Sequence, residues 1–138
     1  MKKSILFLLI NVFCFSTIAQ KIKPDDVVGE WLAESKEGKV LIYKRDNKYF
    51  GKVSWGKNPS KDTKNPNAAL RNNSVIGLEI LKNFVFNGTY WEEGTIYDPK
   101  NGKTYSCTMK MQNINTLDLR GFIGVSLLGR TTVWTRVK

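Results

Sequence analysis

Two tryptophan-bearing segments bracket most of this chain and constrain its fold more than any other feature. Trp31 lies near the start, two residues after Gly29, and Trp134 and Arg136 lie near the end. The sequence between them contains short segments with strand-like alternation and no pattern of a long helix. A buried Trp on a first strand, met by a Trp/Arg strand that returns at the other end, is typical of an antiparallel sheet that closes on itself. The sequence therefore predicts an all-β fold, a small up-and-down β-barrel of about eight strands.

The predicted strands alternate apolar and polar residues and are separated by turn residues. One face of the segment 103–111 carries Tyr105, Cys107, Met109 and Met111. Cys107 is expected to point into the core as an inert apolar residue. We expect strands at residues 29–35, 39–45, 48–55, 91–97, 103–111, 116–122 and 130–137, with one or two further extended segments within 74–86.

The first 19 residues have the pattern of a secretory signal peptide. Lys2 and Lys3 form a basic start, an apolar stretch follows over residues 5–18, and small residues end the segment at Ala19. The alternative is a membrane anchor, but the apolar stretch is shorter than the roughly 20 residues that a spanning helix needs. We therefore expect a signal peptide at residues 1–19, one domain at residues 20–138, and export from the cytoplasm.

Composition narrows the possible chemistry. Without Lys2 and Lys3 the chain keeps 20 basic and 12 acidic side chains, a net charge of about +8, and it contains no histidine. A chain without histidine lacks the commonest metal ligand and general base, so we expect no metal, no cofactor and no enzymatic activity. The basic residues are scattered rather than clustered, which disfavours nucleic acid and favours a solvated surface or an anionic envelope surface.

The order of several short motifs along the chain resembles the DUF2147 family, exported bacterial proteins of unknown function. The motifs are Gly29-x-Trp31, Asn65-Pro66-x-x-x-Leu70-Arg71, Ile76-Gly77-Leu78, Gly94-x-Ile96-Tyr97-Asp98-Pro99-x-x-Gly102-Lys103-x-Tyr105, Leu119-Arg120-Gly121 and Trp134-Thr135-Arg136-Val137. The resemblance covers nearly all of the predicted domain. It implies a calycin-like fold, a lipocalin-type barrel, and a location in the bacterial periplasm or beyond. It implies no reaction.

Several motif residues are expected to serve the fold. Trp31 is predicted to close one end of the barrel beneath an arginine of the last strand, either Arg130 or Arg136, because a guanidinium stacks well on an indole. Trp134 belongs to the same closing strand. A hairpin turn is predicted at residues 98–102, with Asp98 as its cap and Pro99 and Gly102 shaping it. The alternative for this hairpin is ligand contact by Tyr97 and Tyr105.

The polar segment of residues 56–73 is the best candidate for function, because a long loop on a rigid barrel often carries it. A single helical turn is predicted there, with Asn65 as its N-cap and Pro66 at its first position. Asn65, Asn67 and Arg71 suit an anionic or polar head group. The alternative is a solvated lid in which Arg71 bonds only to neighbouring carbonyls.

The function predicted from these features is binding of a small, partly apolar ligand in or at the mouth of the barrel, with Arg71 at the mouth. The expected lining residues are Trp55, Tyr97, Tyr105, Met109, Met111 and Leu119. The alternative is a protein-binding module, such as an inhibitor of an envelope enzyme or an assembly factor, that uses an outer surface or loop of a filled barrel. Eight-stranded barrels occur in both forms.

The predicted signal peptide is testable by intact-mass measurement of the protein isolated from cells. We expect a mass lower than that of the full chain by about 20 residues, because signal peptidase would cleave after Ala19. A membrane-bound product that keeps Met1 would contradict the prediction.

Overall fold

The computed structural model of this protein describes residues 10–14, 20–122 and 129–138. The predicted cleavage site at residues 17–19 and the apolar connection at residues 123–128 lie outside these ranges. Within the described residues, no helix is long and apolar enough to cross a membrane.

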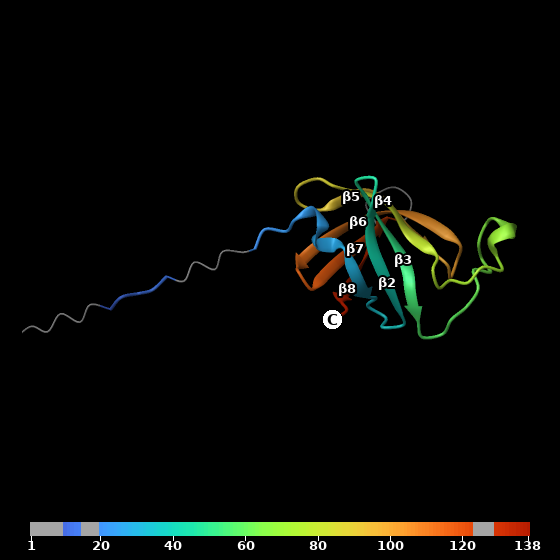
Figure 1. Ribbon diagram of the computed structural model, residues 1–138, viewed down its shortest axis with the longest axis horizontal. Helices are drawn as coiled ribbons and strands as arrows, with labels where there is room; N and C mark the ends of the chain where they lie inside the picture. Colours follow the sequence, from blue (N-terminus) through green and yellow to red (C-terminus); the bar gives the residue numbers. More distant parts are fainter. Residues whose placement is uncertain (1–9, 15–19, 123–128) are drawn as a thin grey trace, which may run out of the picture.

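Eight antiparallel strands close into one barrel, in which each strand pairs with its sequence neighbours and β1 pairs with β8 (Figure 1). This confirms the predicted fold class. The elements in chain order are the 3-10 helix η1 (Pro24–Val27), β1 (Gly29–Leu32), β2 (Gly38–Arg45), β3 (Lys48–Gly56), the 3-10 helix η2 (Ala68–Leu70), β4 (Glu79–Phe86), β5 (Trp91–Asp98), β6 (Lys103–Asn113), β7 (Thr116–Phe122) and β8 (Gly129–Arg136).

The main departure from the sequence prediction lies between β3 and β4. Residues 74–78 do not form a strand, and β4 begins only at Glu79. The predicted helical turn exists, but its N-cap is Asn67 and not Asn65, because the Asn67 side chain accepts a hydrogen bond from the amide of Ala69. We call residues 57–78 the long loop; it stands out from the barrel in Figure 1.

The up-and-down order places alternate connections at opposite ends of the barrel, and these two ends differ in their residues. At the end that we call the plug end, η1 lies beside the β6–β7 turn, and Trp31 lies fully buried beneath them. The Trp31 Nε1 atom donates a hydrogen bond to the carbonyl oxygen of Val27, at 2.9 Å. At the other end, the loop end, lie the connections β1–β2, β3–β4 and β5–β6.

Arg136 holds the plug end together. Its guanidinium carbon lies 4.3 Å from the centre of the Trp31 ring, which confirms the predicted plug and selects Arg136 over Arg130. Its nitrogens donate to the carbonyl oxygens of Ile114 at 2.7 Å, Val28 at 3.0 Å and Asp26. One side chain of β8 therefore binds η1, the start of β1 and the β6–β7 turn.

The inward faces of the strands fill the barrel near the plug end. Cys107 is buried in the core, as predicted, and burial raises the pKa of its thiol to about 12. Close packing requires a glycine at position 94, because a Cβ atom there would lie 2.4 Å from the ring of the fully buried Phe84.

Replacing the plug tests its contribution to stability. We expect Trp31→Ala to lower the free energy of unfolding by roughly 3–5 kcal/mol, because the change leaves a large cavity and removes the surface on which Arg136 stacks. Urea denaturation followed by circular dichroism measures the loss. Trp55→Ala is the control, since Trp55 is 41% exposed and its loss leaves no cavity in the core. Equal unfolding midpoints for the two variants would contradict the plug role.

Candidate functional site

A cavity of about 590 Å³ opens into the barrel at the loop end, and we call it the mouth cavity. It extends inward to the buried side chains of Val40, Val53 and Trp134. Its rim comes from the β1–β2 turn, the long loop and the β5–β6 turn. The other apolar residues that line it are Ala33, Trp55, Pro59, Val75, Ile76, Ile80 and Pro99.

Lysines dominate the charge around the mouth cavity. Lys39, Lys61, Lys64 and Lys100 line it, against two carboxylates, Glu37 and Asp98. Both ion pairs found among the described residues lie elsewhere and involve other cations. The Asp98 carboxylate already accepts a hydrogen bond from the amide of Lys100. The rim therefore presents more positive than negative charge above an apolar interior.

Trp55 connects the apolar interior with this basic rim. A register shift between Lys39 and Val40 pairs Lys39 with Trp55 across β2 and β3. The Lys39 Nζ atom lies 5.3 Å from the centre of the Trp55 ring. The indole is 41% exposed, so a molecule that enters the mouth cavity has direct access to it.

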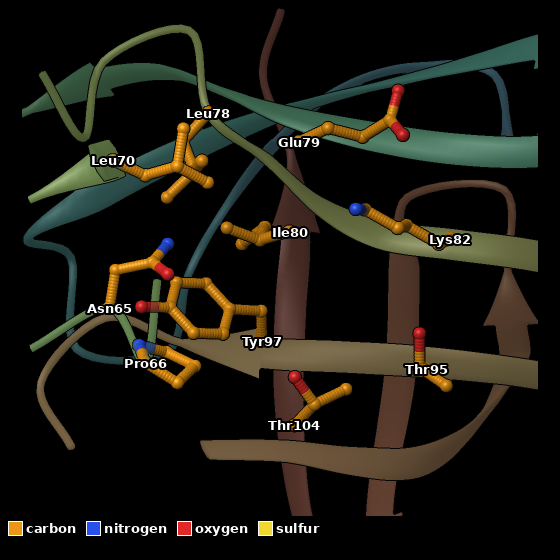
Figure 2. A pocket seen from close by; sticks show the side chains of 10 residues that line it. All are labelled: Asn65, Pro66, Leu70, Leu78, Glu79, Ile80, Lys82, Thr95, Tyr97 and Thr104. Atoms are coloured by element: carbon orange, nitrogen blue, oxygen red, sulfur yellow. The ribbon is translucent and has the colours of Figure 1, made fainter. Parts of the chain in front are cut away.

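A second, smaller cavity of about 240 Å³ lies under the long loop, against the outer face of β4 and β5 (Figure 2). We call it the outer cleft. Strand register explains its position: Leu81 pairs with Ile96, and Leu81 faces the core, so that Tyr97, the neighbour of Ile96, lies on the outer face. The outer cleft is lined by Asn65, Pro66, Leu70, Leu78, Glu79, Ile80, Lys82, Thr95, Tyr97 and Thr104.

The long loop is attached to the barrel through a buried carboxylate. Asp62 is fully buried, and its Oδ1 atom accepts a hydrogen bond from the Tyr97 hydroxyl at 2.7 Å. Its Oδ2 atom accepts one from the Asn65 side chain at 2.8 Å. Partial burial and the hydrogen bond to Asp62 raise the pKa of Tyr97 to about 12.

The β5–β6 turn also contacts the long loop. The amide of Gly102 donates to the carbonyl oxygen of Asp98 at 2.8 Å, and Gly102 has φ +70°, which confirms the predicted turn. A Cβ atom at position 102 would lie only 1.9 Å from the carbonyl oxygen of Lys64. Only glycine lets the loop approach the turn this closely.

The structure distributes the sequence-predicted ligand residues over several places. Trp55 lines the mouth cavity, whereas Tyr97 lines the outer cleft because its strand position points it away from the core. The hydroxyl of Tyr105 accepts a hydrogen bond from the Asn101 side chain at 3.0 Å. Three further residues lie in the buried core and line neither cavity: Met109, Met111 and Leu119.

The predicted loop residues mainly bond to the loop itself. Arg71 donates from Nε to the carbonyl oxygen of Asn65 at 2.8 Å, and it lines neither cavity. The Asn65 side chain bonds to Asp62 and to the amide of Asn67, and Asn67 caps η2. These contacts match the lid alternative for Arg71.

The sequence prediction missed the lysines of the rim and Asp62. A topological signal for some of them was present, because an up-and-down barrel places the β1–β2, β3–β4 and β5–β6 connections at one end. That rule brings Lys61, Lys64 and Lys100 together. No signal in the sequence distinguishes Asp62 from the exposed polar residues around it. Among the described residues, no cluster of three or more His, Cys, Asp or Glu could hold a metal ion.

The closed eight-stranded barrel with a cavity at one end defines a lipocalin-like protein. The chain is similar to the solved structure of protein HP1028 from Helicobacter pylori, described as belonging to the lipocalin family, with a TM-score of 0.73 and 22% identity over 80% of this chain and 82% of that one. At this identity the likeness shows the fold alone. The family model "Uncharacterized protein conserved in bacteria (DUF2147)" matches residues 29–136, so the chain belongs to that family. No curated protein matches the chain.

The contact between Gly102 and the long loop can be tested by Gly102→Ala. We expect a loss of stability of about 1–3 kcal/mol from the strained backbone, and a further loss because the new methyl group meets the Lys64 carbonyl oxygen. Gly88→Ala is the control, since Gly88 also has a positive φ, +101°, but has no atom within 4 Å of the added Cβ. Thermal unfolding of both variants measures the difference, and a milder effect at position 102 than at 88 would contradict the contact.

Proposed function

We propose that this protein binds a small amphiphilic ligand in the mouth cavity, with the apolar part inside and an anionic group at the basic rim. The observation that carries the proposal is the composition of this one cavity: buried Val40, Val53 and Trp134 at its base, and lysines around its opening. Its volume of about 590 Å³ lies in the range of small-molecule sites, roughly 300–1,000 Å³.

The rim lysines take the place that the sequence analysis gave to Arg71. Lys61, Lys64 and Lys100 line the cavity, whereas the Nε atom of Arg71 donates to the carbonyl oxygen of Asn65. An anionic group at the rim would gain charge-assisted hydrogen bonds from the lysine ammonium groups. The predicted signal peptide supports action outside the cytoplasm, where such a protein would hold or carry its ligand without converting it.

A titration with straight-chain fatty acids of increasing length tests the proposal. We expect affinity to rise with chain length, by at most about 0.8 kcal/mol for each buried methylene group, until the cavity is full. Each acid should bind more tightly than the alcohol of equal length, because only the acid carries a charge for the rim lysines. Isothermal titration calorimetry on the delipidated protein measures both series.

Two matched variants locate the binding site in that experiment. Trp55→Ala should weaken the binding of acids and alcohols alike, because it removes apolar surface from the cavity. Ile114→Ala removes a similarly exposed apolar side chain from the plug end and should change neither series. If no acid or alcohol of any length binds, the proposal of ligand binding in the mouth cavity fails and a protein-binding role takes its place.

A further inference from the structure

Asp62 is unusual for an aspartate in a loop, because its side chain is fully buried. Neither ion pair of the described residues involves it. Burying a carboxylate is costly unless its oxygens are hydrogen-bonded, and here Tyr97 and Asn65 each donate to one oxygen. Tyr97 is 35 positions away in sequence. The loop is therefore bound to β5 at one defined point.

The residues around Asp62 divide between two sides. Lys61, Thr63 and Lys64 line the mouth cavity, whereas Asp62 does not. Lys61 also forms an antiparallel bridge with Ser74, and the amide of Asp62 donates to the carbonyl oxygen of Asn73 at 2.8 Å. The pairing of residues 61–62 with residues 73–74 thus holds the backbone here. The buried Asp62 carboxylate determines which side of this segment faces the cavity.

We propose that the Asp62–Tyr97 hydrogen bond is a positioning device, the latch, that sets Lys61 and Lys64 at the rim and thereby gives the mouth cavity its preference for anionic ligands. This rests on the proposed function. Asp62 and Tyr97 are positioning residues, because neither lines the mouth cavity.

The latch also keeps a negative charge away from the ligand. The Asp62 carboxylate lies next in sequence to Lys61, and a free carboxylate in the cavity would pair with the lysines and repel an anionic head group. The two oxygens of Asp62 accept hydrogen bonds from a phenol and an amide, and both of these donors are neutral. The lysines on the cavity side stay available.

Tyr97→Phe removes the latch and leaves the ring. We expect the ratio of acid to alcohol affinity, at equal chain length, to fall about threefold to tenfold, the range expected when one or two partly exposed charge contacts are lost. The alcohol affinity should stay within about twofold of the wild-type value, because the apolar walls are unchanged. The double variant Lys61→Ala/Lys64→Ala should reproduce this loss of selectivity.

Tyr49→Phe is the matched control. The Tyr49 hydroxyl also donates to a carboxylate, that of Asp25 at 2.6 Å, but in the part of the molecule that contains η1. This variant should keep the wild-type selectivity. Amide hydrogen exchange on the ligand-free protein gives a second measurement: in Tyr97→Phe the amides of Asp62 and Asn65 should exchange faster, and in Tyr49→Phe they should not.

The outcomes separate the latch from the proposed function. If the wild-type protein binds acids selectively and Tyr97→Phe keeps both that selectivity and the slow exchange of Asp62, the latch proposal is overturned and the proposed function stands. If Tyr97→Phe loses acid and alcohol binding equally, Tyr97 serves only the fold and the latch proposal is again overturned. If the wild-type protein binds neither series, both proposals fall.

Discussion

The stacking of Arg136 on Trp31 is the contact on which the barrel depends. The register of β1 and β8 pairs only Trp31 with Arg136 and Leu32 with Thr135, so backbone pairing at this seam is short. The guanidinium adds a stacked indole and hydrogen bonds to three carbonyl oxygens, which belong to residues on both sides of the seam. Without this closure, β1 and β8 would be free edges able to pair with other chains.

Closure at the plug end determines where a ligand site can lie. Large side chains fill that end, among them the fully buried Trp31, Ile42 and Trp91. Smaller residues, Val40 and Val53, take the inward positions towards the loop end, and the mouth cavity begins there. Stability and candidate function therefore occupy opposite ends of one short barrel. The buried core also explains how the domain folds without a disulfide, since Cys107 is a free buried thiol.

The sequence predicted the fold well because the strand signals are local. Alternation and the turn at residues 98–102 depend on neighbouring residues, and both were confirmed within a few positions. The two bracketing segments predicted the closing contact of Trp31 with an arginine of the last strand, which was also confirmed. The site was predicted poorly because it depends on register and loop path. Tyr97 fell on the outer face through strand parity, and Met109 and Leu119 lie in the buried core. Asn65 and Asn67 are both suitable caps, and only the structure distinguishes them.

The basic rim raises the question of why lysines, and not Arg71, lie at the mouth. A guanidinium has several donors in a fixed plane, and Arg71 uses one of them on the Asn65 carbonyl, which makes it suitable for binding the loop to itself. Lysine carries a mobile point charge on a flexible stem, which would suit the head group of the proposed ligand at different depths in the cavity. The buried Asp62 carboxylate has a structural role like that of Arg71, because its two oxygens accept hydrogen bonds from Tyr97 and Asn65. The lysines of the same loop line the cavity.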